Sequence, residues 1–290
     1  MEIDKPSGGS GEQNNFPEPY VPELDIQYPD DLHKHIVDIK MTHETVVDEN
    51  YPFLDKSFSF RFMRRLMHLG IYTLVFALSP LRYGIKIEGR KNLRKHKKLL
   101  KNGAMTISNH MHRWDLLFVL QAVRYRMMYF PALKDNLGSS DEDFIRLAGG
   151  IPIPTEISLM KLFYQAFDEI VANKKWIHAF PESAQFPYYQ PIRPFKKGVF
   201  TMALRYNLPI VPIAISYRKP HFPHTLDNIM RSLKGVKQKL PMITVRIGEP
   251  LLFDGNLSRK EAVQKMRKEC HEAVVRLAGI KNNQHPAEGD

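Results

Sequence analysis

From residue 85 onward, short apolar segments rich in β-branched residues alternate with longer segments whose apolar residues recur at helical spacing. This alternation limits the fold more than any other feature, because it is typical of a layered domain in which helices cover a sheet. We expect strands at residues 85–88, 104–108, 127–130, 176–180, 210–216 and 243–247. We expect helices at residues 116–124, 158–173, 197–206 and 259–277. Ser258 and Glu261 fit a capping box at the start of the last helix. The sequence therefore predicts an α/β domain over residues 85–280.

The two ends of the chain differ from this region in composition. Residues 1–20 are rich in Gly, Ser, Asn and Pro without periodicity, which predicts a flexible tail. We expect residues 1–55 as a whole to form a polar, acidic and partly flexible extension. Residues 281–290 are expected to form a second flexible tail. The first residues lack the basic-then-apolar order of a secretory signal, so we do not expect a secreted protein.

A basic and apolar segment, residues 56–84, joins the extension to the domain. Arg61, Arg64 and Arg65 precede an uncharged apolar run at residues 69–78. That run is about half of the roughly 20 residues that a spanning helix needs. We therefore expect a helical segment that lies in a membrane interface, where its basic residues hold phosphates and its apolar face is buried among acyl chains. The alternative is an ordinary core helix capped by Pro80.

The charge of the chain is asymmetric. Its net charge is +11, but residues 1–50 contain 12 Asp and Glu against 3 Lys and Arg, so residues 51–290 carry +20. Such a surface attracts nucleic acid, anionic lipid head groups and phosphorylated or coenzyme-like substrates. The basic residues show no aromatic interleaving and no helix-turn-helix or zinc-finger pattern, which argues against nucleic acid. The basic run at residues 90–101 is either a solvated helix or loop or a second contact with anionic lipid.

The chain contains one cysteine, Cys270, and 43% of its residues are hydrophobic. A single cysteine excludes an intrachain disulfide and leaves zinc sites of the Cys₄ or Cys₂His₂ type without ligands. It also fits a reducing compartment, so the cytoplasm is the expected location. The apolar content is sufficient for a full core, which excludes a chain disordered throughout.

The strongest candidate for chemistry is the pair His110 and Asp115, which follows the predicted strand at residues 104–108. Sites of open α/β sheets lie beyond the carboxyl ends of the strands. A turn between strand and helix can bring the Asp115 carboxylate to one imidazole nitrogen, so that the other nitrogen removes a proton from a hydroxyl. With no serine or cysteine nucleophile assigned, that hydroxyl belongs to the substrate. The alternatives are a hydrogen-bonded surface histidine and an aspartate that only caps a helix.

His112 adds a second interpretation. On an extended segment, His110 and His112 would lie on one face and, with Asp115, could begin a metal site. Further ligands would have to come from His178, His221 or His224, which are candidates by residue type alone. We do not expect a metal.

Two further polar segments follow predicted strands or begin helices. Phe180, Pro181, Glu182 and Ser183 come after the strand at residues 176–180, and Glu182 could bind a substrate hydroxyl or amine, or pair with a neighbouring arginine. Residues 191–198 place Arg193, Lys196 and Lys197 at the start of a predicted helix, where a phosphate or coenzyme contact and a charged helix start are equally consistent with the sequence.

Taken in order, these segments resemble the glycerolipid acyltransferase family. That family is marked by His-x₄-Asp, a Gly-rich motif that ends in arginine, Phe-Pro-Glu-Gly, and a Val-Pro-Ile type motif. The matching segments in this chain, within residues 85–250, are His110 to Asp115, Gly149-Gly150-Ile151-Pro152-Ile153, Phe180-Pro181-Glu182-Ser183 and Ile210-Val211-Pro212-Ile213.

The resemblance implies a mixed sheet flanked by helices, an N-terminal membrane-contacting helical segment, and a fatty acyl donor in the form of acyl-CoA or acyl carrier protein. It implies that His110 is the general base and that Asp115 orients it. Acceptor and donor binding is then expected from the two intervening motifs and the basic segment, namely Phe180, Pro181, Glu182, Ser183, Gly150, Ile151, Pro152, Arg193 and Lys196. No cofactor is expected.

The chain departs from the family pattern at three positions. Thr155 follows Pro154 where the second motif usually ends in arginine, Ser183 replaces the glycine of Phe-Pro-Glu-Gly, and Gln185 replaces a second arginine. The resemblance associates those arginines with the phosphate of the acceptor. Arg193, Lys196 and Lys197 are the candidates to supply the missing positive charge.

Together these observations predict a 1-acylglycerol-3-phosphate O-acyltransferase-like enzyme at the cytoplasmic face of a membrane, held there peripherally. It would transfer a fatty acyl group to a lysophospholipid, with lysophosphatidic acid as the first candidate, and its partners would be an anionic lipid surface, the acceptor and the acyl thioester. Two alternatives stay open: a metal-dependent hydrolase using His110, His112 and Asp115, and a non-catalytic protein that binds anionic lipid.

Overall fold

A mixed seven-stranded sheet forms the centre of the computed structural model, which describes residues 16–32, 34, 36, 43, 45–124 and 127–288. Its strands, in the order in which they lie side by side, are β1 (Lys86–Glu88), β7 (Met242–Ile247), β6 (Ile210–Arg218), β2 (Met105–Ser108), β5 (Trp176–Ala179), β3 (Met128–Leu133) and β4 (Gly150–Ile153). Only β6 and β7 pair antiparallel; the other pairs are parallel. The carboxyl ends of β2, β3, β4, β5 and β6 therefore share one edge of the sheet.

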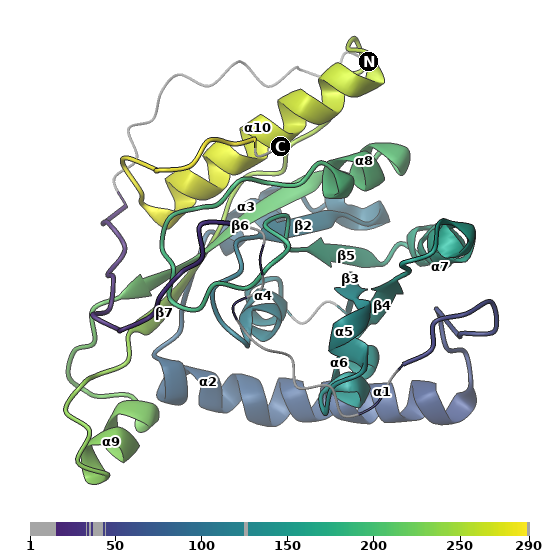
Figure 1. The fold of residues 1–290 in the computed structure, drawn as a ribbon. Coiled ribbons are helices and arrows are strands. Elements are labelled where there is room, and N and C mark those ends of the chain that lie inside the picture. Colours follow the sequence, from purple (N-terminus) through teal and green to yellow (C-terminus); the bar gives the residue numbers. More distant parts are fainter. Residues whose placement is uncertain are drawn as a thin grey trace.

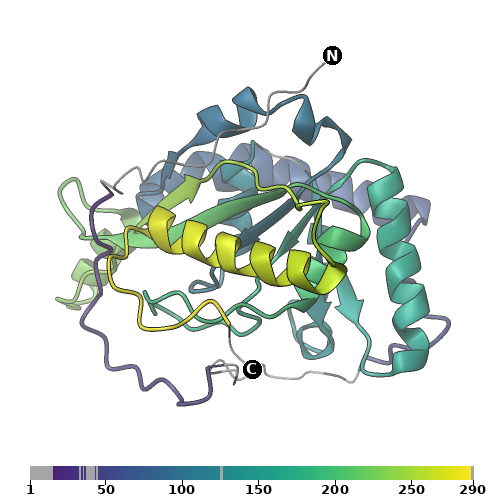
Figure 2. The same cartoon turned by 90° about the horizontal axis from the view of Figure 1, so that it is seen from above.

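Helices cover both faces of this sheet. They are α3 (Arg90–Lys95), α4 (Asp115–Ala122), α5 (Lys134–Leu137), α6 (Glu142–Ala148), α7 (Met160–Ala172), α8 (Gly198–Arg205), α9 (Leu226–Leu233) and α10 (Arg259–Ala278). Figure 1 shows α10 and α8 on one face and α4 on the other, and Figure 2 shows α10 lying across the sheet. Two clusters of buried apolar side chains fill these two interfaces. The expected mixed sheet flanked by helices is confirmed.

The six predicted strands and four predicted helices are all present, with bounds shifted by a few residues. The capping box is present too: the Ser258 hydroxyl accepts the Glu261 backbone N–H, and the Glu261 carboxylate accepts the Ser258 backbone N–H. The strand β4 was not predicted, because Gly150 and Pro152 disfavour a strand and are tolerated here at the edge of the sheet. The short helices α5, α6 and α9 were not predicted either, whereas α3 agrees with the helix or loop expected within residues 90–101.

Residues 58–83 form one helical rod, seen along the lower side of Figure 1. It consists of α1 (Phe58–Gly70), a π-helical turn (Ile71–Val75) and α2 (Phe76–Tyr83). One side packs against the domain, and the opposite side exposes the apolar side chains of Phe58, Phe62, Leu66, Leu69, Leu74, Leu78 and Leu81. A π-helical turn places residues five apart on one face, so Leu69 and Leu74 stay in the same stripe. In the described part of the chain, no helix is both long and apolar enough to cross a membrane.

The C-terminal end of the chain is more ordered than we expected. Residues 1–15, most of the predicted N-terminal tail, lie outside the described residues. Phe53, in the predicted extension, is buried in the core. Residues 281–288 are not a free tail: Asn283 hydrogen-bonds the backbone N–H and C=O of Ile192, and Glu288 pairs with Arg267 at 2.9 Å. Polar side chains that satisfy backbone groups elsewhere in the fold hold this segment in place.

The capping box of α10 leads to a prediction about stability. Ser258→Ala should lower the free energy of unfolding by about 1 kcal/mol, because the Glu261 N–H loses its partner. Ser258→Thr, which keeps the hydroxyl, is the matched control and should stay within about 0.5 kcal/mol of the wild type. Urea unfolding followed by circular dichroism measures both, and equal losses for Ala and Thr would contradict a capping role.

Candidate active site

The chain leaves β2 through a residue that ties it to the neighbouring strand. Asn109 is 2% exposed; its amide donates to the Ile215 C=O at 2.9 Å and its side-chain oxygen accepts the Ile215 N–H at 2.8 Å. Ile215 belongs to β6, so these two bonds continue the β2–β6 ladder through a side chain. Asn109 therefore fixes the point at which the next residue, His110, emerges at the carboxyl edge of the sheet. The sequence analysis did not identify it.

His110 and Asp115 meet as the sequence predicted. The distance from His110 Nδ1 to Asp115 Oδ2 is 2.9 Å, with the aspartate fully buried and the imidazole side chain 20% exposed. Because a carboxylate only accepts hydrogen bonds, the Nδ1 nitrogen carries the proton and Nε2 is left as the basic nitrogen. No partner of Nε2 is seen among the described residues. The pair thus presents a free imidazole nitrogen at the open edge of the sheet.

Asp115 does more than hold the imidazole. Its Oδ2 also accepts the backbone N–H groups of Met111 at 2.7 Å and His112 at 2.8 Å. These donors belong to the loop before α4, so the carboxylate organises that loop and is not simply a cap for the helix that begins at Asp115. The N-terminus of α4 also favours a negative charge at this position. One side chain therefore sets both the path of the loop and the orientation of His110.

Glu182 and Arg193 form a buried pair directly beneath the loop. The exposed fractions of these residues are 2% and 1%. Glu182 Oε2 accepts the His110 backbone N–H at 2.8 Å and the Arg193 guanidinium at 2.9 Å, while Oε1 accepts the Arg193 backbone N–H at 2.8 Å. Both carboxylate oxygens are thus occupied inside the protein. The expected role of Glu182 in acceptor binding is not consistent with this geometry, whereas the alternative of an arginine partner is.

Arg193 is equally unavailable to a substrate. Its guanidinium also donates to the backbone C=O groups of Leu32 and Ala184, and it lies over the Phe186 ring with 3.9 Å to the centroid. A guanidinium with this many partners cannot bind an external anion without breaking the loop structure. The expected anion contact by Arg193 is therefore corrected to a structural one.

Other residues of the third motif lie around the imidazole. The Phe180 ring stacks on His110 with centroids 4.0 Å apart, and Pro181 is buried behind it. Ser183 has a φ of 63°, in the left-handed region that glycine adopts without strain, which explains why the resembling family has glycine there. Lys196 donates its backbone N–H to the Pro181 C=O at 2.8 Å and has an exposed side chain. Lys196 is thus a cation beside this loop that can reach solvent.

The Gly-rich segment lies farther away. Gly150, Ile151 and Pro152 are buried in β4, and β5 and β3 lie between β4 and β2. With strands spaced about 4.8 Å apart, this places β4 about 14 Å from β2 across the sheet. Gly149 has a φ of 112°, and a Cβ there would lie 2.3 Å from the Met128 C=O, so this glycine is required by packing. These three residues therefore do not lie beside His110, and their expected part in acceptor or donor binding stays a prediction.

The histidines considered as metal ligands are not gathered together. His112 Nδ1 accepts the Trp114 backbone N–H at 3.1 Å, and its ring contacts the rings of Tyr83 and Phe118, away from Asp115. Burial lowers the pKa of His178 to about 3, and its Nδ1 lies 2.9 Å from the Thr106 hydroxyl. In the described part of the chain, no three His, Cys, Asp or Glu residues are placed to share a metal ion.

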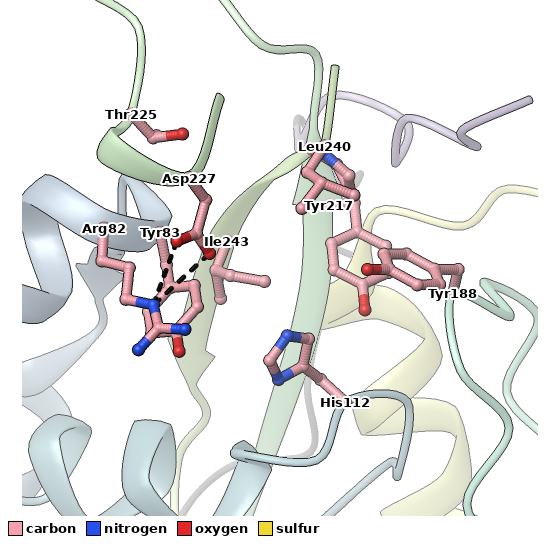
Figure 3. A pocket seen from close by; sticks show the side chains of 10 residues that line it. Arg82, Tyr83, His112, Tyr188, Tyr217, Thr225, Asp227, Leu240 and Ile243 are labelled. Atoms are coloured by element: carbon pink, nitrogen blue, oxygen red, sulfur yellow. Dashed lines mark hydrogen bonds and ion pairs between the residues drawn. The ribbon is translucent and has the colours of Figure 1, made fainter. Parts of the chain in front are cut away.

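A small cleft opens on the far side of His112 (Figure 3). Its lining comes from α2, the loop between β2 and α4, the segment between β5 and α8, β6, β7 and the residues around α9. The lining residues are Arg82, Tyr83, His112, Tyr188, Tyr217, Thr225, Asp227, Leu240, Pro241 and Ile243. Burial lowers the pKa of His112 and raises that of Tyr188, so both are neutral hydrogen-bonding groups at pH 7. The sequence does not predict this cleft, because its lining residues are spread from Arg82 to Ile243 without a common motif.

Comparison with known proteins agrees with the motifs. The family model described as Acyltransferase matches residues 84–216, a range that contains His110, Asp115 and Glu182. No curated protein shows significant sequence similarity to the chain. Among solved structures, the chain is similar to the 1-acyl-sn-glycerophosphate (LPA) acyltransferase PlsC from Thermotoga maritima, with 17% identity, 79% of this chain and 85% of that chain covered, and a TM-score of 0.48.

The buried pair beneath the loop allows a test of its structural role. Glu182→Ala should lower the free energy of unfolding by about 3–5 kcal/mol, because it leaves the Arg193 guanidinium buried without its carboxylate. Glu169→Ala is the matched control: Glu169 pairs with Lys56 on the surface, and its loss should cost less than about 1 kcal/mol. Urea unfolding measures both. Similar losses for the two variants would contradict the role given to Glu182.

Proposed function

We propose that the chain, whose residues 84–216 match the family model described as Acyltransferase, is a membrane-associated O-acyltransferase. Its donor is an acyl thioester, acyl-CoA or acyl carrier protein, and its acceptor is the hydroxyl of a lysophospholipid, with lysophosphatidic acid giving phosphatidic acid as the first reaction to test. The observation that carries this proposal is the 2.9 Å contact between His110 Nδ1 and the buried Asp115 carboxylate, which leaves Nε2 as a base at the exposed edge.

His110 acts in this proposal as the general base. Nε2 takes the proton of the acceptor hydroxyl as the oxygen attacks the carbonyl carbon of the thioester. The imidazolium that forms is stabilised by Asp115, whose charge lies against Nδ1. When the tetrahedral intermediate collapses, the C–S bond breaks and the proton passes to the leaving thiolate. The products are the ester and the free thiol, and no covalent enzyme intermediate is needed.

The surrounding residues have positioning roles. Asp115 orients the imidazole, Phe180 supports one face of it, and Glu182 holds the His110 backbone from below. The tetrahedral intermediate carries a negative oxygen that requires hydrogen-bond donors or a cation. Lys196, exposed beside the Phe180–Ser183 loop, is the side chain we propose for contact with an acceptor phosphate or a donor pyrophosphate.

The membrane location rests on the helical rod at residues 58–83. Its outer face combines the exposed apolar stripe described above with the exposed Arg61 and Arg65. An apolar face flanked by arginines is the composition of an interfacial helix. We propose that this face binds the cytoplasmic surface of a membrane that contains anionic lipid. The alternative of an ordinary core helix accounts for the buried Arg64, His68 and Ile71. It does not account for the exposed apolar stripe on the opposite side of the rod.

The two alternative functions make different demands. A metal-dependent hydrolase needs His112 beside His110, and the His112 ring instead contacts Tyr83 and Phe118. It also requires that chelation abolishes activity, which the proposed acyl transfer does not. A non-catalytic lipid-binding protein would bind vesicles yet release no thiol from acyl-CoA with any acceptor.

Two variants test the catalytic pair. His110→Ala and Asp115→Asn should each lower kcat by about 10²–10⁴, because the reaction loses its base or the orientation of that base. Thiol release from acyl-CoA measures turnover, and circular dichroism checks the fold. His221→Ala, which removes an exposed histidine near α9, is the matched control and should keep wild-type activity. Near-normal acyl transfer by His110→Ala would overturn the assignment.

The acceptor is identified by a panel experiment. The protein is incubated with labelled acyl-CoA and, separately, lysophosphatidic acid, other lysophospholipids and lipid alcohols, and each product is identified by mass spectrometry. We expect a diacylated phospholipid from lysophosphatidic acid, and a several-fold increase in KM for that acceptor in Lys196→Gln with kcat unchanged. An ester formed with none of the acceptors would contradict the proposed function.

A further inference from the structure

The helix α9 presents an apolar face that no described part of the chain covers. Met230 and Leu233 are 53% and 77% exposed, and Leu226 and Ile229 are 45% and 42% exposed on this eight-residue helix. Val236 and Phe222, just beyond its two ends, are exposed as well. Single exposed apolar residues are ordinary, but contiguous patches mark a contact surface.

The helix is held rigidly in this position. Thr225 caps its N-terminus by accepting the Asn228 backbone N–H, and the Asn228 side chain, fully buried, bonds both the N–H and the C=O of Leu240. These bonds close residues 225–240 into a compact hairpin-like unit. The apolar face is therefore a fixed feature of the folded protein and is not a frayed helix that turns outward.

Basic residues accompany the apolar residues of α9 in the sequence. Residues 219–241 contain five Lys and Arg and one acidic residue, Asp227. Asp227 is engaged by Arg82 of α2 at 3.1 Å, so it does not neutralise the others. Lys234 and Lys237 are exposed and have no ion-pair partner among the described residues. Exposed apolar side chains together with lysines are the composition that favours binding at the interface of a bilayer that contains anionic lipid.

The same ion pair joins α9 to the helical rod. Figure 1 shows α9 beside α2, on the side of the sheet opposite α10, and Figure 3 shows Arg82 reaching Asp227 from α2. The exposed stripe of the rod ends at Leu78 and Leu81, next to Arg82. The apolar side chains of α9 thus lie on a helix that adjoins the end of the rod that we propose for membrane contact.

We propose that α9 is a second lipid-docking element, whose Met230 and Leu233 insert among acyl chains while Lys234 and Lys237 bind anionic head groups. This inference rests on the membrane location in the proposed function. It concerns a segment outside the family match, which ends at residue 216. Contact at α9 as well as at α1 fixes the rotation of the protein about the rod. The cleft that Arg82, His112 and Asp227 line adjoins both α2 and α9.

Vesicle binding without acyl donor tests this inference independently of turnover. The full-length protein is sedimented with vesicles of phosphatidylcholine containing roughly a fifth of phosphatidylglycerol, a fraction that gives a clear negative surface. Met230→Gln combined with Leu233→Gln should weaken binding about tenfold or more, since two apolar side chains are no longer available to insert among the acyl chains. Lys234→Gln and Lys237→Gln should each weaken it about fivefold on these vesicles and leave binding to pure phosphatidylcholine unchanged.

The matched control replaces two exposed apolar residues away from this surface, Ile157→Gln with Leu252→Gln, and should bind as the wild type does. Turnover with a short-chain, monomeric lysolipid should be unchanged in Met230→Gln/Leu233→Gln. Wild-type vesicle binding by that variant would overturn the proposal. So would light scattering that shows a wild-type dimer without vesicles and a monomeric variant, since α9 would then be an interface between copies. Vesicle binding without any acyl transfer would instead overturn the proposed function and leave the docking role supported.

Discussion

The buried carboxylate of Glu182 is the interaction on which the candidate site depends. It receives the backbone N–H of His110 from the loop after β2, and the backbone and guanidinium of Arg193 from the segment before α8. His110 lies 72 positions from Glu182 in the sequence and Arg193 lies 11 positions from it, and both are held at this one carboxylate. Each partner also satisfies a charge or polar group that would be costly to bury alone. The Glu182 carboxylate thereby holds the loop that contains His110 and Asp115 in place.

Asp115 and Asn109 further organise the loop after β2. Asp115 collects two backbone N–H groups and the imidazole, so the local path of the chain and the orientation of His110 are determined together. Asn109 extends the pairing of β2 with β6 past the end of the strand. Such preorganisation means that the imidazole need not be reoriented when a substrate binds. For the proposed acyl transfer, the protein would supply a fixed base and the substrate its own nucleophile.

The surface of the molecule is arranged around the same edge. The rod of α1 and α2 turns an apolar stripe outward, α9 lies beside it, and the cleft lined by Arg82, His112 and Tyr188 lies between these helices and the loop. A water-soluble donor and a lipid acceptor must meet at one base in the proposed reaction. In that proposal, helices that contact lipid and also border the loop are suited to that requirement.

Much of this arrangement was predictable from local pattern. Alternating strand and helix periodicity located six strands and four helices, because these periodicities reflect which face of an element is buried. The spacing from His110 to Asp115 predicted their contact, since a short strand-to-helix turn leaves few other arrangements. β4 was missed because Gly150 and Pro152 disfavour strands, and the cleft was missed because it is assembled from distant segments.

The sequence by itself determined six of the seven strands, four helices of the domain and the pairing of His110 with Asp115, since each of these depends on neighbours within a few residues. Composition alone set the asymmetry of charge. The tertiary structure alone decided what Glu182 and Arg193 do. Their residue types were compatible with contact to a substrate, but burial makes each the only adequate partner of the other, and burial is a property of the packed fold. The same holds for α9: only the fold shows that its apolar residues are exposed and that the helix lies beside α2.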